Sequence, residues 1–360
     1  MLGKTRRLAL LAEGCFNATD AKSAVGVLRY RTSEVVAVID STRAGRTAQS
    51  CAGVGGDVPV VANLEGAAAY DPDTLLIGIA PQGGALPAPW RAVVAEALLR
   101  GMDVIAGLHQ FLADDPELAT LAESKGCRLI DVRRPPAART IATRRAASVD
   151  ALVVLTVGSD CNVGKMTTAL ELQAALAATG VKAAFVATGQ TGIFIADRGV
   201  AVDAVVSDFV AGAVEDMVVD AARDAEVVLV EGQGSIHHPG YSGVSLGLLH
   251  GACPDAMILC HQAGRTHIKT FEAGPAPRIR SLVDVARDHE RAAGWVAPSR
   301  VIGVSLNTVS LDDAEAKRAI EHEAQRVALP VTDPVRYGAQ PLAAAIVRRL
   351  EERRRRAAGA

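Results

Sequence analysis

Short apolar runs alternate along the first 145 residues with longer stretches that mix apolar and polar side chains. The apolar runs predict β-strands, and three of the mixed stretches predict α-helices. Because strands and helices alternate, we expect a parallel sheet with right-handed crossover connections. The predicted strands are 7–12, 35–40, 58–61, 74–80, 103–107 and 128–132, and the predicted helices are 17–30, 90–100 and 116–125.

The same alternation resumes after residue 150, and small or polar side chains follow most of the apolar runs. This pattern is typical of a doubly wound parallel sheet, which binds ligands beyond the carboxyl ends of its strands. The predicted strands are 152–157, 181–187, 227–230, 256–260, 301–306 and 329–333, and the predicted helices are 166–179 and 209–223.

Residues 133–147 are rich in arginine and proline and show no hydrophobic period, which indicates a linker or a crossing segment. We therefore expect an α/β protein with an N-terminal domain at 1–145 and a C-terminal domain at 146–360. Gly14 after the first strand and Asp40 at the end of the second are a faint sign of a dinucleotide-binding fold. The Gly-x-Gly-x-x-Gly motif is missing, so no cofactor is assigned to this Rossmann-like domain.

The apolar strand at 152–157 leads through a glycine-punctuated loop to Lys165 and a predicted helix. This order is typical of a phosphate-binding loop (P-loop), in which backbone N–H groups, a helix N-terminus and a lysine surround an anion. We therefore expect the domain to resemble P-loop NTPases and to bind a pyrophosphate or a similar group. The residues assigned to this site are Gly158, Ser159, Asp160, Asn162, Val163, Gly164, Lys165, Met166, Thr167 and Thr168.

Two features differ from the usual P-loop motif. Five residues separate Gly158 from Gly164, where the motif has four, and Met166 occupies the place of the hydroxyl that holds Mg²⁺. A thioether is a poor ligand for a hard cation, and Thr167 and Thr168 are not in register to replace the hydroxyl. The loop is therefore expected to hold phosphates without hydrolysing them, and no metal is assigned.

Polar residues also follow the strand at 227–230. Glu231 ends this strand, and in a P-loop protein such an acid lies beside the loop, where it can hold Mg²⁺ or accept a proton. His237 and His238 follow, and two imidazoles in one loop can relay protons near neutral pH. Adjacent histidines seldom share a metal without a third ligand, which makes a metal the weaker interpretation.

Composition narrows the classes of function. The net charge of −2 gives no electrostatic reason to expect binding to nucleic acid or to a membrane. No segment reaches the roughly 18 apolar residues of a membrane helix. The six cysteines lie far apart without a Cys-x-x-Cys pair, which indicates neither a zinc site nor a disulfide framework. A cytoplasmic enzyme of small molecules is the expectation.

The P-loop and the acidic strand end carry a resemblance to known families. Residues 158–165 and 230–235 resemble dethiobiotin synthetase and related P-loop proteins, although that group normally has Thr where this chain has Met166. A closer resemblance is to the D-glutamate (D-amino acid) N-acetyltransferases, which have a Rossmann-like N-terminal domain and a P-loop C-terminal domain and are tied to D-glutamate catabolism. The stretches that carry it are 164–168, 188–192, 205–212, 231–235, 238–239, 241–243 and 248–251.

This resemblance implies transfer of the acetyl group of acetyl-CoA to the α-amine of D-glutamate or a related D-amino acid. Coenzyme A carries a pyrophosphate and a 3′-phosphate, which a P-loop without a Mg²⁺ ligand can hold. Acetylation of an amine needs a general base, for which Glu231, His237 and Asp208 are the candidates. Glu231 is the leading hypothesis, acting directly or through His237, with a pKa raised by partial burial. Substrate binding is assigned to Gln190, Thr191, Arg198, Ser235, His238 and Arg265, the two arginines as partners of the substrate carboxylates.

Two other functions stay open at this stage. The first is an ATP- and Mg²⁺-dependent ligase or kinase of the dethiobiotin synthetase type. The second is a nucleotide-sensing module without chemistry, in which Glu231 and the histidines would be structural. Related P-loop enzymes often place their sites at dimer interfaces, so a homo-oligomer is expected.

Overall fold

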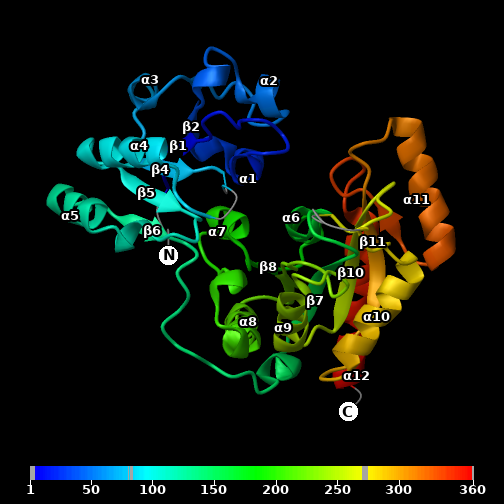
Figure 1. Cartoon of the computed structure of the whole chain (residues 1–360). Coiled ribbons are helices and arrows are strands. Elements are labelled where there is room, and N and C mark those ends of the chain that lie inside the picture. The colour runs from blue at the N-terminus through cyan, green and yellow to red at the C-terminus, as the bar shows by residue number, and fades with distance from the viewer. Residues whose placement is uncertain (1–4, 80, 82–83, 270–274, 359–360) are drawn as a thin grey trace. The chain divides into compact units, whose positions relative to one another are not determined.

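The computed structural model describes residues 5–79, 81, 84–269 and 275–358. The chain forms two compact units (Figure 1). The N-terminal unit contains residues 1–135 together with 189–204, and the C-terminal unit contains 136–188 and 205–360. The sequence predicted one passage between domains, at residue 145; the two units are joined by three, after residues 135, 188 and 204.

The N-terminal unit is built on a six-stranded parallel sheet of order β3-β2-β1-β4-β5-β6. This is the strand order of a Rossmann-like fold, in which successive strands are added on one side of β1 up to β3 and on its other side from β4 onward. All six predicted strands are confirmed, with ends that differ by a few residues; residue 80, the expected end of the fourth, lies outside the described residues. The strands are β1 Leu8–Leu11, β2 Val35–Ile39, β3 Val60–Val61, β4 Thr74–Ile77, β5 Asp103–Ala106 and β6 Leu129–Asp131.

Helices cover both faces of this sheet, because right-handed crossovers on either side of β1 place them on opposite faces. Every residue of β1 and β4 is buried, which explains why these strands consist almost wholly of Leu, Ile and Ala. The predicted helices are confirmed, although the first begins at Lys22 rather than at residue 17. The helices are α1 Lys22–Tyr30, α2 Ala48–Ala52, α3 Leu64–Ala68, α4 Ala88–Leu99 and α5 Pro116–Lys125.

A further helix of this unit, α7 (Gln190–Ala196), comes from the middle of the sequence. It lies beside α1 (Figure 1), and Phe194 is a fully buried member of the N-terminal core. Arg133, itself buried, donates hydrogen bonds to the carbonyl of Gly107 (2.7 Å) and to Oε1 of Gln190 (2.7 Å), and pairs with Asp203. The arginine thus fixes both ends of segment 189–204 to this unit.

The core position of Phe194 carries a stability prediction. Phe194→Ala leaves a cavity between α7 and α1 and is expected to destabilise the protein by about 3–5 kcal/mol. Urea unfolding followed by circular dichroism measures the loss. Phe111→Ala is the control, because Phe111 is half-buried under the Arg134 guanidinium. Equal losses for the two variants would contradict a core role for Phe194.

The C-terminal unit is built on a second six-stranded parallel sheet, of order β12-β11-β10-β7-β9-β8. β7 lies in its middle and is buried along its whole length. The predicted strands and the doubly wound fold class are confirmed. The strands are β7 Leu152–Gly158, β8 Ala183–Val186, β9 Val227–Val230, β10 Ala256–Gln262, β11 Val301–Asn307 and β12 Val331–Thr332.

Two helix layers enclose this sheet. One layer pairs the first and last helices of the unit around Leu172, Leu176, Leu342 and Ile346, and the other contains the remaining helices. The helices are α6 Lys165–Ala178, α8 Ser207–Ala221, α9 Ser242–Ala252, α10 Leu282–Gly294, α11 Asp313–Val327 and α12 Gln340–Ala358.

Small residues allow α8 and α9 to pack closely. A Cβ atom at Gly247 would contact the side chain of Val210, and one at Gly251 would overlap the carbonyl group of Ala211. Ser242 and Gly243, within one of the stretches that carry the resemblance, form the start of α9. Gly247 and Gly251 are four residues apart, so they lie on the same face of α9, which is the face against α8.

The segment that enters the C-terminal unit is anchored by one buried acid. Glu215 on α8 is fully buried and accepts hydrogen bonds from the backbone N–H groups of Thr143 and Arg145, and from the Arg145 side chain. Burial disfavours the charged carboxylate, but these hydrogen bonds together outweigh that effect and lower the pKa of Glu215. Arg145 of the arginine-rich run therefore has a structural role.

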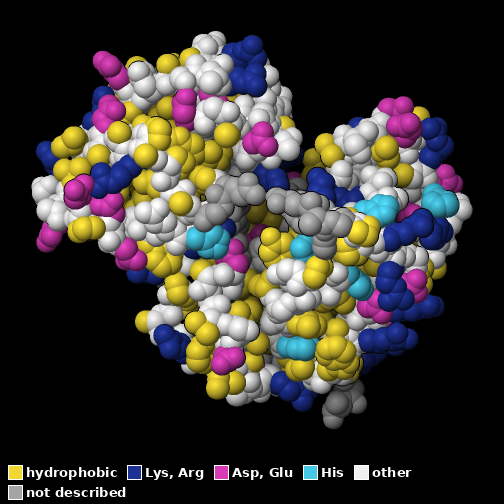
Figure 2. Space-filling view, in the orientation of Figure 1, with side chains coloured by type: hydrophobic (Ala, Val, Ile, Leu, Met, Phe, Trp, Pro, Cys, Tyr) yellow, Lys and Arg dark blue, Asp and Glu magenta, His cyan; other side chains and the backbone are white. Residues whose placement is uncertain are grey.

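Basic and acidic side chains are interspersed over the visible face of each unit in Figure 2, in keeping with the small net charge. Across the described part of the chain, none of the helices combines the length and the apolar character that a membrane crossing requires.

Candidate functional site

The P-loop connects β7, the central strand, to α6. Gly158 is the last residue of β7. Glycine suits this position because a Cβ atom there would lie 2.8 Å from the Nζ atom of Lys165. Gly164 has φ +102°, a conformation that suits glycine, at the turn into the helix. Lys165 is the first residue of α6, so the loop's backbone N–H groups, the positive helix end and the ammonium converge.

The Lys165 side chain is buried and folded into the loop. Its Nζ atom donates a hydrogen bond to the carbonyl oxygen of Asp160 at 2.8 Å. Burial lowers the pKa of Lys165. A buried ammonium that donates to a carbonyl oxygen can donate in the same way to a phosphate oxygen.

The buried carboxylate of Asp160 stabilises the conformation of the P-loop through hydrogen bonds. This fully buried group accepts hydrogen bonds from the backbone N–H of Cys161 (2.7 Å), from Nη1 of Arg265 (3.0 Å) and from the backbone N–H of Lys269 (2.9 Å). Arg265 Nη1 also donates to the carbonyl of Cys161 (2.7 Å). The arginine predicted to bind substrate carboxylates is thus engaged with the loop itself.

Side-chain hydrogen bonds also join the P-loop to β10 and the start of α6 to β11. Ser159 Oγ lies 2.7 Å from Nδ1 of His261. Burial, with a smaller effect of Arg265, lowers the pKa of His261 to about 4, so this histidine is neutral at physiological pH. Thr168 Oγ1, one of the hydroxyls considered as a Mg²⁺ ligand, is buried 2.7 Å from Ser305 Oγ.

Glu231 follows β9 directly and is buried at the same edge of the sheet. Its Oε2 accepts the backbone N–H of Thr188 at 2.9 Å, and Thr188 Oγ1 donates to the carbonyl of Glu231 at 2.8 Å. The side chain and the backbone of Glu231 are thus both hydrogen-bonded to Thr188. The next residue, Gly232, is in contact with β7, because a Cβ atom there would overlap the carbonyl of Thr156.

His237 makes a contact that the sequence did not reveal. Its Nε2 lies 3.0 Å from Oδ2 of Asp288 on α10, and Arg280 forms an ion pair with the same carboxylate oxygen. The Nδ1 atom of His237 is buried and has no hydrogen-bond partner among the described residues. Asp288 lies far from His237 in sequence, and no local motif links the two.

A second histidine lies against the first. The His289 ring is edge-on to His237, with ring centroids 5.9 Å apart. Burial, with smaller effects of His237 and Lys165, lowers the pKa of His289 to about 4.

His238 lies against the P-loop. Donor atoms of Asp160, Cys161 and His238 all lie within 4.8 Å of one another, a spacing that could hold a metal ion. The Asp160 carboxylate, however, accepts three hydrogen bonds, and each ring nitrogen of His238 faces a backbone group: the N–H of Gly240 at 3.1 Å and the carbonyl of Lys269 at 3.3 Å. We therefore assign no metal to these three residues.

The remaining predicted site residues lie in different surroundings. Ser235 is buried, and its Oγ accepts the backbone N–H of His237 at 3.3 Å. Asp208 is exposed in the first turn of α8. Three others belong to the N-terminal unit: Gln190 bonds Arg133, Thr191 Oγ1 lies 2.9 Å from Ser23 Oγ, and Arg198 is exposed. Their assignment to substrate binding stays a prediction.

Asp40 of the N-terminal unit has a structural role. It is fully buried and accepts hydrogen bonds from the backbone N–H groups of Phe16 (2.9 Å) and Thr42 (2.9 Å) and from the Thr42 hydroxyl. A dinucleotide-binding domain uses the acid at this position to hold a ribose. Here the carboxylate is occupied by the loops around it.

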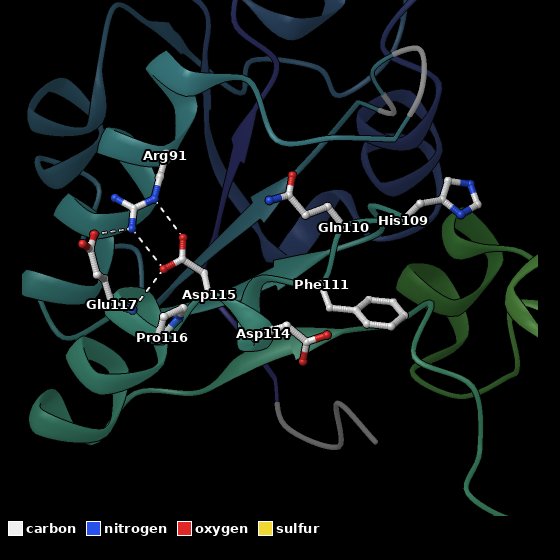
Figure 3. Close-up of a pocket in the computed structure, with 8 residues that line it drawn as sticks. All are labelled: Arg91, His109, Gln110, Phe111, Asp114, Asp115, Pro116 and Glu117. Carbon is white, nitrogen blue, oxygen red and sulfur yellow. Dashed lines mark hydrogen bonds and ion pairs between the residues drawn. The ribbon is translucent and has the colours of Figure 1, made fainter.

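A cavity of about 660 Å³ lies elsewhere in the N-terminal unit, beyond β5 and at the start of α5 (Figure 3). Arg91 points toward Asp115 and Glu117 and is paired with both. His109 also lines this cavity. None of the predicted site residues does.

Strand order and the glycine-lysine loop define the class of this molecule: an α/β protein that joins a Rossmann-like domain to a P-loop domain. The comparison with protein families gives the same pair of domain types. Residues 41–135 match the Rossmann-like domain DUF1611_N, and residues 140–343 match the P-loop domain DUF1611_C, both described as domains of unknown function. The chain belongs to the DUF1611 family.

Named relatives give the class of activity. A D-glutamate N-acetyltransferase of Tritonibacter scottomollicae is 40% identical over 330 residues, covering 91% of this chain and 94% of the relative. A D-glutamate N-acetyltransferase of a Pseudoalteromonas species is 37% identical over 272 residues, 75% of this chain and 80% of the relative. The crystal structure of a DUF1611 family protein from Anabaena variabilis is 40% identical, with a TM-score of 0.90 over 95% of this chain and 99% of that one. The expected resemblance is confirmed, and the chain is an acyltransferase of the N-acetyltransferase class.

Proposed function

We propose that this protein transfers the acetyl group of acetyl-CoA to the α-amine of D-glutamate or a related D-amino acid. The observation that carries the proposal is the presence, in one unit, of a phosphate cradle and a buried imidazole nitrogen that has no hydrogen-bond partner among the described residues. Acetyl-CoA is a thioester that carries phosphates, and the cradle can hold them. The amine must lose a proton before it attacks the thioester, and the imidazole nitrogen can accept that proton. The names of the two relatives supply the acceptor and the acetyl group.

In the proposed reaction His237 Nδ1 takes a proton from the substrate ammonium. The free amine attacks the thioester carbonyl, a C–N bond forms, and the tetrahedral intermediate loses a second proton as the C–S bond breaks. The leaving thiolate is protonated, so the products are the N-acetyl amino acid, coenzyme A and one proton in net release. Among the three candidate bases, His237 is favoured over Asp208, which is exposed, and over Glu231, whose Oε2 already accepts the Thr188 N–H.

The P-loop is proposed to hold the phosphates of coenzyme A. Its backbone N–H groups, the start of α6 and Lys165 act on charge alone and need no cation. Met166 in place of a hydroxyl fits this use better than a Mg²⁺–ATP site.

The direct test is incubation of the pure protein with acetyl-CoA and a panel of D- and L-amino acids, followed by mass detection of N-acetyl products. We expect N-acetyl-D-glutamate and little product from L-glutamate. His237→Gln protein, prepared in parallel, controls for contaminating acetyltransferases. Absence of product from every acceptor, with wild-type protein that binds coenzyme A, would overturn the acetyl-transfer proposal.

Metal removal separates this function from the ATP-dependent alternative. Turnover is expected to persist in excess EDTA, because Met166 replaces the Mg²⁺ ligand and Thr168 is hydrogen-bonded to Ser305. Initial rates before and after chelation measure the effect. A strict requirement for Mg²⁺, restored by titration, would favour a ligase or kinase.

Two further proposals concern the cellular location and the oligomeric state of the protein. A cytoplasmic location is supported by the free thiols of all six cysteines, which suit a reducing compartment. A homo-oligomer is supported by the resemblance to P-loop enzymes with sites at dimer interfaces, and light scattering after size-exclusion chromatography tests it.

A further inference from the structure

The unpartnered nitrogen of His237 needs a physical explanation. Leaving a buried polar atom without a hydrogen bond costs about 1–3 kcal/mol, so such atoms are uncommon in folded proteins. Nδ1 of His237 is one of four such side-chain atoms among the described residues. A ligand that brings an N–H group to this nitrogen would remove the cost.

The other ring nitrogen is fixed by an acid. Nε2 lies 3.0 Å from Oδ2 of Asp288, and the two side chains are 23% and 19% exposed, so solvent competes little for the contact. Arg280 pairs with the same oxygen, and Arg291 Nη1 lies 3.9 Å from the other one. The Asp288 carboxylate thus faces two guanidinium groups. An ionised carboxylate accepts hydrogen bonds only, so Nε2 must carry the hydrogen.

We propose that Asp288, supported by Arg280, is a positioning residue that holds His237 in the Nε2–H form and leaves the Nδ1 lone pair free to accept the substrate proton. The inference rests on the proposed acetyl transfer and adds a residue that neither the motif nor the resemblance indicated. Asp288 also stabilises the imidazolium that forms when Nδ1 takes the proton, because the carboxylate then faces a positive charge.

The charged and titratable groups around His237 are compatible with this role. Asp288 and His289 face it from α10, and Arg280 precedes that helix. Lys165 acts on the same region from the P-loop, and His238 is the adjacent residue. His289 stays neutral because burial lowers its pKa to about 4, so it does not compete for the proton.

The first test is spectroscopic and needs no turnover. Long-range ¹H–¹⁵N correlation spectra of ¹⁵N-histidine protein report which ring nitrogen carries hydrogen, with His237→Gln identifying the signal. We expect the Nε2–H form for neutral His237 in the wild type, and a mixture of the two forms in Asp288→Asn. An Nδ1–H form in the wild type would overturn the inference, whether or not the protein acetylates D-glutamate.

The second test is kinetic. Asp288→Asn is expected to lower kcat about tenfold with little change in KM for acetyl-CoA. The imidazolium loses its anionic partner, so the acid limb of the kcat/KM profile should move to lower pH. Asp284→Asn is the matched control, since Asp284 lies one turn earlier on α10, also beside Arg280 (4.0 Å), and makes no contact with His237 among the interactions described. It should leave the profile unchanged.

A double variant separates positioning from general support of the fold. In a His237→Gln background, Asp288→Asn should cause no further loss, because the two residues act as a unit. An additional tenfold loss, or a fall in kcat without movement of the acid limb, would assign Asp288 to the fold alone. A wild-type protein with the expected Nε2–H form but no acetylation of any amine would overturn the proposed function and leave the tautomer assignment standing.

Discussion

His237→Gln is expected to lower kcat by about 10² to 10⁴, the usual contribution of one general base, while coenzyme A binds almost as tightly as before. Glutamine preserves a polar contact with Asp288 but provides no basic nitrogen at the position of Nδ1. The buried lone pair that we assign to the substrate proton is lost, and the P-loop is untouched.

Steady-state kinetics with D-glutamate and isothermal titration with coenzyme A measure the two effects separately. Glu231→Gln is the informative companion, because the amide oxygen can still accept the N–H of Thr188. We expect a smaller loss for this variant. If Glu231→Gln lost 10² to 10⁴ in kcat and His237→Gln were nearly as active as wild type, Glu231 would be the base and His237 a neighbour.

Lys165→Met is expected to weaken binding of coenzyme A by about 10- to 100-fold, the value of a hydrogen bond to a charged group. Methionine fills much of the space between Gly158 and Gly232 but carries no charge. Binding of the wild type should also weaken at alkaline pH. Burial lowers the pKa of Lys165, so the ammonium that the phosphate needs is lost at a lower pH than in a free lysine.

Isothermal titration across pH measures both effects. In the variant the alkaline decline should disappear together with the affinity. Lys182→Met is the control, since Lys182 is exposed just before β8. Unchanged affinity in Lys165→Met would place the phosphates outside the P-loop.

The architecture was accessible from the sequence because both sheets are parallel and buried. The strands at 74–77 and 152–158 are fully covered, so they appear as uninterrupted apolar runs, and the order strand, glycine loop, lysine and helix is local in sequence. The carboxyl ends of such strands meet at one edge, which is why Glu231 could be placed beside the P-loop before the fold was known.

The contacts between segments that are distant in sequence could not be predicted. Asp288 lies on a helix with polar residues on its outer face, and nothing near it in sequence indicates a partnership with His237. Arg265 was assigned to substrate because the chemistry of arginine suits a carboxylate; only the fold shows that Asp160 is the carboxylate it contacts. Gln190 follows a strand of the P-loop domain, yet the burial of Phe194 against the N-terminal core determines where that segment packs.

The contribution of segment 189–204 to the N-terminal unit has a consequence for how the protein is made. A ribosome synthesises β7, α6 and β8 before Phe194 appears, so the N-terminal core stays incomplete while much of the P-loop region has already emerged. Domains that are contiguous in sequence can fold in order of synthesis, but this N-terminal unit must wait for a later piece of the chain. A truncated protein that ends at residue 135 would therefore lack part of its hydrophobic core. A single proteolytic cut could not release either unit intact.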